Sequence, residues 1–328
     1  MGTKVRFSTG LITFGNQNDR FCGLGYKEDK SIEDMFLDAS KVKDLSGLEL
    51  VGGQVKRDDD IKLIKKLKDN YGFDIVGITV DLFTEPRWSR GSFSSSNPET
   101  RKQAVEEVKR CMDVIKELDS DLINIWPGQD GHDYVFQSDY IKSWGYIIEG
   151  INKCAEYRED VKLSIEYKPK EPRTHSFIST IGKTIALLNK INKDNVGITI
   201  DVGHALYAYE NVAESVSLCK LHGKELFLLH LNDNYRYWDD DMMVGSVHIP
   251  EYIELIYWLI KTDYKGWYSL DIFPYRENGI RAAEESIEWL KSMIEAVDKL
   301  DKEEVETIIG NGDATRSTKM LREIFFKK

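Results

Sequence analysis

Eight short apolar runs, each followed by a segment with helical periodicity, constrain the fold of this chain more than any other feature. The runs are rich in Ile, Val, Leu and Phe and mostly lack strict alternation, which is typical of strands buried on both faces. In chain order they are KVRFS at 4–8, LELVG at 48–52, DIVGITV at 74–80, DLINIW at 121–126, KLSIEY at 162–167, VGITID at 196–201, ELFLLHL at 225–231 and WYSLDI at 267–272.

Helical periodicity predicts a helix in each of the intervening segments. The predicted helices lie near residues 31–42, 58–69, 98–118, 136–158, 176–190, 211–222, 250–261 and 278–297. The helix predicted at 98–118 begins with Asn97 as a suitable N-cap residue and Pro98 as the first helical residue. Strand and helix therefore alternate eight times, which predicts an α/β fold of the (β/α)8 TIM-barrel type rather than an open sheet.

The domain organisation follows from the same pattern. The chain has 328 residues and shows no repeat, low-complexity stretch or linker. We therefore predict one domain over residues 1–328, with the barrel at about 4–297. The remaining segment, about 300–328, is predicted to form a short C-terminal helical tail of one or two helices.

Composition and charge argue against several classes of partner. The formal net charge is −11, and Lys and Arg are interleaved with Asp and Glu. Such a surface repels phosphate backbones, so we predict no nucleic-acid partner. The four cysteines form no CxxC pair, which favours a reducing compartment. The amino-terminal residues contain no apolar signal region and no run is long enough to span a membrane, so we predict a cytoplasmic protein without membrane contact.

Four potential metal ligands stand at the ends of consecutive predicted strands. They are Glu166, Asp201, His230 and Asp271. Each alone has an ordinary structural explanation, as a helix cap or a hydrogen-bonded core histidine. In a TIM barrel, however, the carboxyl ends of the strands meet at the catalytic face. Carboxylates with one imidazole suit Mn²⁺, Mg²⁺ or Co²⁺, and without a cation the carboxylates would repel one another.

A second set of potential ligands lies next to the first. Asp239 and Asp241 follow the seventh strand in the acidic loop NDNYRYWDDDMMVGSVH, and His204 is three residues after Asp201. Taken alone, the acidic loop would be read as a solvated surface. Beside four aligned ligands, we favour a second metal site in which Asp201 bridges the two ions.

Several motifs resemble those of the xylose isomerase-like barrels, the aldose–ketose isomerases, in the branch that contains xylose isomerase and rhamnose isomerase. The motifs are EYKPKEPR, DVGH, WDDDMMVG and the pair GSFSSSNPETRKQAVEEVKRCMDVIKEL and INIWPGQDG. The resemblance covers roughly residues 70–290. It implies that both ligand sets hold divalent cations, two per chain, with Mn²⁺ favoured and Mg²⁺ or Co²⁺ as alternatives.

The resemblance also implies an activity. It is a 1,2-hydride shift, assisted by the cations, that interconverts an aldose and a ketose in the open-chain form. Lys168 corresponds to the lysine that hydrogen-bonds the sugar carbonyl oxygen, and Glu166 and Asp271 complete the catalytic group. The partners implied are a small monosaccharide and further copies of the chain in a dimer or tetramer.

Four residues are expected to contact the sugar. Trp126 aligns with a residue that lines the sugar pocket, and Trp88 and Phe93 are further aromatic candidates for its walls. Arg57 aligns where xylose isomerase has its ring-opening histidine. His230 stands where xylose isomerase has a carboxylate, which favours the rhamnose isomerase pattern.

Three alternative functions stay open at this point. A one-metal ketose 3-epimerase would use Glu166 and a strand-eight carboxylate as an acid–base pair, but it leaves His204, Asp239 and Asp241 without a role. A related C-glycoside-cleaving enzyme is a variant of that alternative. A sugar-binding protein without catalysis is compatible with the composition, whereas a DNA-repair endonuclease on this barrel would need more histidines and a basic groove.

Overall fold

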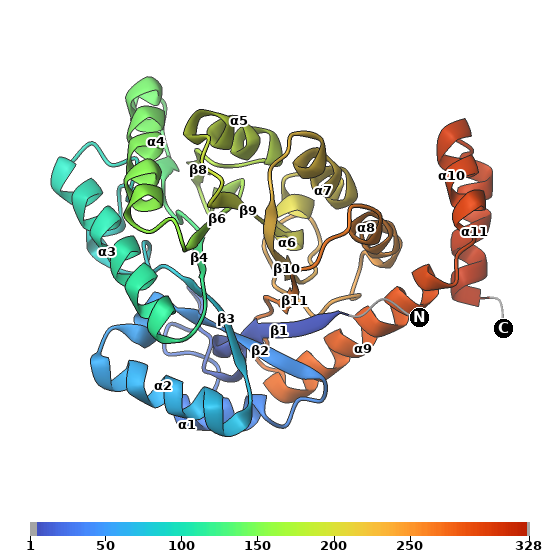
Figure 1. Cartoon of the computed structure of the whole chain (residues 1–328), viewed down its shortest axis with the longest axis horizontal. Coiled ribbons are helices and arrows are strands. Elements are labelled where there is room, and N and C mark those ends of the chain that lie inside the picture. Colours follow the sequence, from blue (N-terminus) through green and yellow to red (C-terminus); the bar gives the residue numbers. More distant parts are fainter. Residues whose placement is uncertain (1–4, 327–328) are drawn as a thin grey trace.

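The computed structural model describes residues 5–326 and contains a closed barrel of eight parallel strands (Figure 1). Residues 1–4, 327 and 328 belong to the predicted domain but lie outside the described part. The order of hydrogen-bonded strands around the barrel is β1-β11-β10-β9-β6-β4-β3-β2. Helices surround the barrel, as Figure 1 shows, so the predicted (β/α)8 TIM-barrel class is confirmed.

Every predicted apolar run overlaps one strand of the barrel. The barrel strands are β1 (Arg6–Gly10), β2 (Leu45–Val51), β3 (Asp74–Thr79), β4 (Leu122–Ile125), β6 (Lys162–Glu166), β9 (Val196–Asp201), β10 (Leu226–Leu231) and β11 (Trp267–Leu270). Neighbouring strands are paired in parallel throughout, with Glu166 beside Thr199 and His230 beside Asp201. This register brings the carboxyl ends of β6, β9 and β10 to one level of the barrel.

The outer helices follow the predicted order. The eight helices that match the predicted segments are α1 (Ile32–Ala39), α2 (Asp58–Tyr71), α3 (Pro98–Glu117), α4 (Tyr140–Tyr157), α5 (Ile181–Ile191), α7 (Val212–Leu221), α8 (Ile249–Lys261) and α9 (Gly279–Asp298). Asn97 caps α3 as predicted, because its side chain accepts a hydrogen bond from the Glu99 amide. A short helix, α6 (Val202–Tyr207), starts directly after β9.

Two predicted helix starts, at residues 136 and 176, are too early by four or five residues. A small antiparallel sheet that the apolar pattern does not reveal is formed by segments that precede these two helices. Its strands, in the order β5-β8-β7, are β5 (Gly131–His132), β7 (Lys170–Glu171) and β8 (Thr174–Ser176). Three short 3₁₀ helices complete the loops, η1 (Leu11–Phe14), η2 (Gly52–Val55) and η3 (Pro86–Trp88).

Large apolar side chains fill the amino-terminal end of the barrel. Phe227 and Trp267 pack there against a small buried cluster of aliphatic residues. Two strand glycines make room for the rings, because a Cβ atom at Gly197 would lie 2.4 Å from Phe227 and one at Gly47 would lie 2.8 Å from Trp267. The polar groups of the barrel are therefore gathered toward its opposite, carboxyl-terminal end.

The C-terminal tail consists of α10 (Lys302–Asn311) and α11 (Ala314–Phe326), which confirms the prediction of one or two short helices. Figure 1 shows this helical hairpin standing to one side of the barrel, after α9. Asp301 begins it by accepting hydrogen bonds from two backbone amides of the first turn of α10. None of the helices in residues 5–326 combines the length and the apolar character that crossing a membrane requires.

Candidate metal centre

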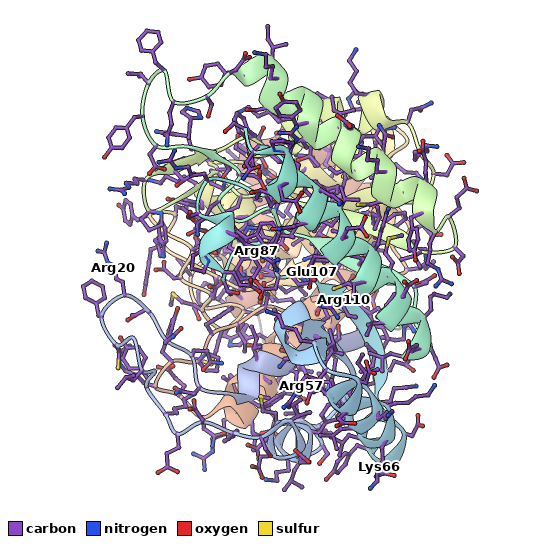
Figure 2. All side chains as sticks on the ribbon, turned by 90° about the vertical axis from the view of Figure 1, so that its left-hand side faces the viewer. Arg20, Arg57, Lys66, Arg87, Glu107 and Arg110 are labelled. Atoms are coloured by element: carbon purple, nitrogen blue, oxygen red, sulfur yellow. The ribbon has the colours of Figure 1, made fainter. Side chains whose placement is uncertain are left out.

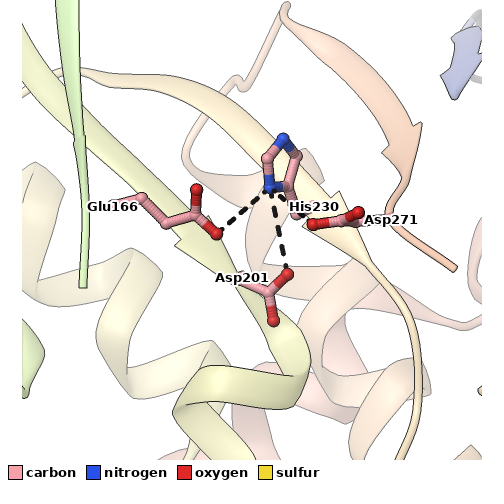
Figure 3. Close-up of side chains that lie close together, drawn as sticks. All are labelled: Glu166, Asp201, His230 and Asp271. Carbon is pink, nitrogen blue, oxygen red and sulfur yellow. Dashed lines mark hydrogen bonds and ion pairs between the residues drawn. The ribbon is translucent and has the colours of Figure 1, made fainter. Parts of the chain in front are cut away.

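Four strand ends bring together the first set of predicted metal ligands. Glu166 is the last residue of β6, Asp201 is the last residue of β9, His230 lies in β10 and Asp271 directly follows β11. Each offers one ligand atom, and these four atoms all lie within 4.8 Å of one another. Figure 3 shows the four side chains pointing toward one another. The predicted convergence of these residues at the carboxyl end of the barrel is therefore observed.

The Nδ1 atom of His230 lies at the middle of the first set. It is 3.3 Å from Glu166 Oε1, 3.4 Å from Asp271 Oδ2 and 3.9 Å from Asp201 Oδ2. These are the three contacts drawn as dashed lines in Figure 3. Glu166, Asp201 and His230 are buried, whereas the Asp271 side chain is 28% exposed. The set therefore opens toward solvent on the side of β11.

The electrostatics of the first set show crowded negative charge. Burial and the neighbouring carboxylates raise the pKa of Asp271 to about 7 and that of Asp201 to about 6. Burial alone would also raise the pKa of Glu166, but His230, His204 and Asn124 lower it to about 2. A divalent cation among these oxygens would relieve the repulsion, because it favours the ionised form of every carboxylate it contacts.

The second set shares Asp201 with the first. Asp201, His204 and Asp239 form a group whose ligand atoms lie within 4.8 Å of one another, and all three are buried. His204 Nε2 lies 3.1 Å from Asp239 Oδ2. Asp201 also caps α6, since its Oδ1 accepts a hydrogen bond from the His204 amide at 2.8 Å. This cap orients the first turn of α6, so that the His204 ring faces the site.

Asp241 lies beside the second set. Its Oδ1 accepts a hydrogen bond of 3.3 Å from Asn232 Nδ2, and the same amide nitrogen donates to both oxygens of Asp201. Burial, together with Asp239, Asp271 and Asp201, raises the pKa of Asp241 well above its usual value. The compact group of mutually close ligand atoms comprises the other three residues, so coordination by Asp241 stays a prediction.

Buried polar atoms without hydrogen-bond partners indicate that these residues are suited to bind cations. His204 Nδ1, Asp239 Oδ1 and Asn232 Oδ1 are buried without a hydrogen-bond partner among the described residues. Leaving a buried polar atom unpaired costs about 1–3 kcal/mol. A bound cation and its water ligands would satisfy such atoms, and the donor set of carboxylate oxygens with imidazole nitrogens is the one that Mn²⁺ and similar ions accept.

Lys168 lies beside the second set, as its spacing from Glu166 predicted. Its ammonium group forms an ion pair of 2.9 Å with Asp239 Oδ2 and a second ion pair with Glu171. Burial alone would lower the pKa of Lys168, but Asp239 and Glu171 raise it well above its usual value. Lys168 is therefore a buried, fully charged donor at the edge of the metal centre.

The predicted aromatic residues take different places. Trp126 lies near the centre, with its ring 5.0 Å from Lys168 Nζ and packed edge-on against Phe83. Trp88 and Phe93 are fully buried in the hydrophobic core. Phe93 packs tightly on α4, where a Cβ atom at Gly150 would lie 2.3 Å from its ring. Contact of Trp88 and Phe93 with a sugar stays a prediction.

The structure does not bring Arg57 to the ligand groups. Its side chain is 79% exposed and forms an ion pair of 2.6 Å with Asp60 at the start of α2. Figure 2 shows Arg57 on the flank of the barrel that also carries Glu107 and Arg110. Acidic residues in the first turn of a helix attract a nearby guanidinium group, which explains this placement. The placement gives no support to the predicted role of Arg57 in sugar binding.

Three polar residues around the ligands were not identified from the sequence. Glu49 in β2 contacts His230 Nε2 at 3.2 Å. Asn124 in β4 donates a hydrogen bond of 2.6 Å to Glu166 Oε2. Asn232, just after β10, donates to Asp201. Each of the three is a polar residue within or next to an apolar run predicted to be a strand. That unusual position is the signal in the sequence that could have marked them as functional residues.

Comparison with known proteins agrees with this fold. The sequence pattern of the family described as xylose isomerase-like TIM barrel matches residues 41–293. Xylose isomerases from Thermus thermophilus and Thermus caldophilus are 28% and 27% identical to this chain over 236 and 238 residues, 69% of this chain in each case. The chain spans about 61% of the length of these two relatives.

Several solved structures share the architecture. A D-tagatose 3-epimerase-like protein superposes with a TM-score of 0.69 and 23% identity, covering 90% of this chain and 99% of that chain. D-psicose 3-epimerase from Clostridium cellulolyticum H10 superposes with a TM-score of 0.70 and 15% identity, covering 88% of this chain and 99% of that chain. An L-ribulose 3-epimerase superposes with a TM-score of 0.71 and 14% identity, covering 90% of this chain and 96% of that chain. At these identities the likeness shows the fold alone. The closed barrel and the family match over 253 of its 328 residues, counted from 41 to 293, show that this chain belongs to the xylose isomerase-like TIM barrel family.

Proposed function

We propose that this chain is a sugar isomerase that interconverts an aldose and a ketose by a 1,2-hydride shift on the open-chain monosaccharide, with the help of divalent cations. The observation that carries the proposal is the pair of ligand sets that share Asp201, with Lys168 beside the second set. The two related xylose isomerases support it. Because the chain spans about 61% of their length, the argument rests chiefly on the site.

Two cations, preferably Mn²⁺, would occupy the two ligand sets. The proposed ligands of the first are Glu166, Asp201, His230 and Asp271. The proposed ligands of the second are Asp201, His204, Asp239 and Asp241. When bound, divalent cations polarise sugar oxygens and stabilise negative charge that develops on them. The protein contributes the buried, preorganised cage, in which Asp201 is common to both sets.

Lys168 is the proposed donor to the sugar carbonyl oxygen. An ammonium group has three N–H donors, and two of them face Asp239 and Glu171. One donor is left for a substrate oxygen on which charge develops. Trp126, 5.0 Å from the ammonium, offers an apolar wall against which the carbon face of the sugar can pack.

One observation favours the one-metal ketose 3-epimerase as a second candidate. The Lys168 ammonium lies 2.9 Å from Asp239 Oδ2 and already neutralises this carboxylate, so the second set has a positive charge beside it without a metal ion. In that alternative, Glu166 and Asp271 would act as the acid–base pair and a single cation would suffice. His204, whose buried Nδ1 atom has no hydrogen-bond partner among the described residues and lies 3.3 Å from Glu166 Oε1, would then have no cation to bind.

Cation stoichiometry separates the two candidates. After removal of metal by a chelator and dialysis, titration with Mn²⁺ should give about two ions per chain, since two ligand sets are present. The double variant Asp239→Ala/Asp241→Ala should bind about one ion, because the first set is left intact. Elemental analysis and isothermal titration calorimetry measure both numbers.

Asp240→Ala is the matched control for this experiment. Asp240 lies between the two substituted residues, but its carboxylate accepts a hydrogen bond from the Tyr235 amide and is outside both ligand groups. The control should therefore keep two ions. A ceiling of one ion in the unmodified protein, unchanged in the double variant, would contradict the two-cation proposal and support the epimerase.

A further inference from the structure

Glu49 is a buried carboxylate inside the barrel that the proposed mechanism does not use. It lies in β2 and is 5% exposed. In the closed barrel β1 and β11 separate β2 from β10, so the side chain reaches His230 across the interior. Its Oε2 lies 3.2 Å from His230 Nε2, and its Oε1 accepts a hydrogen bond from Ser269 Oγ.

The two ring nitrogens of His230 face different surroundings. Nδ1 faces the carboxylates of the first ligand set at 3.3–3.9 Å, whereas Nε2 faces Glu49. Figure 3 shows the second ring nitrogen pointing away from the three carboxylates. A neutral imidazole carries hydrogen on one nitrogen and a free lone pair on the other. Both nitrogens face carboxylates, but a cation in the first set would take the lone pair of Nδ1. The hydrogen then stays on Nε2, where the Glu49 carboxylate can only accept it.

We propose that Glu49 is a positioning residue of the metal centre: it holds hydrogen on His230 Nε2, fixes the orientation of the ring and thereby makes Nδ1 the coordinating atom. Carboxylate partners of this kind are common behind metal-bound histidines and increase the basicity of the ligand. The inference rests on the first cation site of the proposed function, but not on the identity of the reaction.

Ser269 completes the arrangement from the neighbouring strand. It lies in β11, paired in register with His230, and donates its hydroxyl hydrogen to the other oxygen of Glu49. Among the described residues, no lysine or arginine forms an ion pair with Glu49, whereas His230 does. The Glu49 carboxylate therefore interacts with the His230 imidazole and takes no part in an ion pair with a lysine or arginine among the described residues.

The first test measures cation affinity. Glu49→Ala should weaken Mn²⁺ binding at the first set by about 10–100-fold, the loss typical of removing such a partner. Glu49→Gln should retain most of the affinity, because its amide oxygen can accept from Nε2 while its NH₂ group donates to Ser269. Ser269→Ala removes the donor to the other oxygen of Glu49 and should weaken the affinity less than Glu49→Ala. Unchanged affinity in Glu49→Ala, with its fold verified by circular dichroism, would overturn the proposal.

The second test needs no variant of Glu49. In the unmodified protein loaded with Mg²⁺, long-range ¹H–¹⁵N correlation spectra should show His230 protonated at Nε2, with the His230→Gln spectrum identifying its signals. Protonation at Nδ1 would refute the positioning role, even if the protein isomerised sugars. Protonation at Nε2 in a Mg²⁺-loaded protein that turns over no sugar would uphold it, while the proposed function failed.

Discussion

Asp201→Asn is expected to abolish cation binding at both ligand sets and to lower turnover by at least ~10³-fold. Asp201 is fully buried and is the residue that the two sets share. A metal ion supplies several kcal/mol of charge stabilisation, and each ~1.4 kcal/mol corresponds to tenfold in rate. Replacement by Asn removes the charge, but an Asn side chain can still cap α6.

The capping role of Asp201 calls for a matched control. Asp139 caps α4 in the same way, since its side chain accepts a hydrogen bond from the Lys142 amide, and it lies outside the ligand groups. Asp139→Asn should therefore leave cation content and turnover close to those of the unmodified protein. Elemental analysis and steady-state kinetics measure the two quantities. If Asp201→Asn kept two cations and full turnover, the shared-ligand arrangement would be wrong.

Lys168→Met is expected to lower turnover by about 10²–10³-fold, the loss typical of removing one preorganised donor to a developing oxyanion. Methionine keeps an unbranched apolar stem up to Cε and lacks the ammonium, which lies 5.0 and 5.7 Å from the rings of Trp126 and Trp238. The fold and the first cation site should therefore survive. Because the ammonium no longer neutralises Asp239, affinity at the second set should stay equal or increase.

Lys170→Met is the control for the loss of a positive charge. Lys170 is two residues further along the chain, and its ammonium lies 5.4 Å from the Tyr207 ring rather than on a ligand carboxylate. Its removal should change turnover little. Steady-state kinetics on the same sugar compares the two variants. Undiminished turnover in Lys168→Met would remove Lys168 from the mechanism.

The sequence predicted the barrel because strands buried on both faces leave dense apolar runs. All eight runs became barrel strands. The small sheet of β5, β7 and β8 escaped prediction because strands of two or three residues have no measurable periodicity. Its strand β8 ends at Ser176, which explains why the predicted start of α5 was five residues early.

The ligand sets were predictable because topology places the carboxyl ends of the strands together. Glu49 was not, since its partner His230 is 181 residues away and no local pattern links them. The alignment placed Arg57 at the sugar site, but η2 separates it from the end of β2. Its guanidinium group forms an ion pair with Asp60 in the acidic first turn of α2 instead. Local sequence therefore indicated the residues on strand ends, but not the contacts that cross the barrel.

The most direct test of the proposed function follows deuterium through the reaction. A screen of aldoses and ketoses with Mn²⁺ first identifies a substrate, and the aldose is then labelled at C2. If hydride passes between C1 and C2, the ketose should retain the deuterium at C1. An enediol route with a carboxylate such as Glu166 as base would pass the hydrogen through an exchangeable acid. Retention of the label at C1 is the result we expect, and its extensive loss to solvent, or interconversion of ketoses without any aldose, would contradict the account.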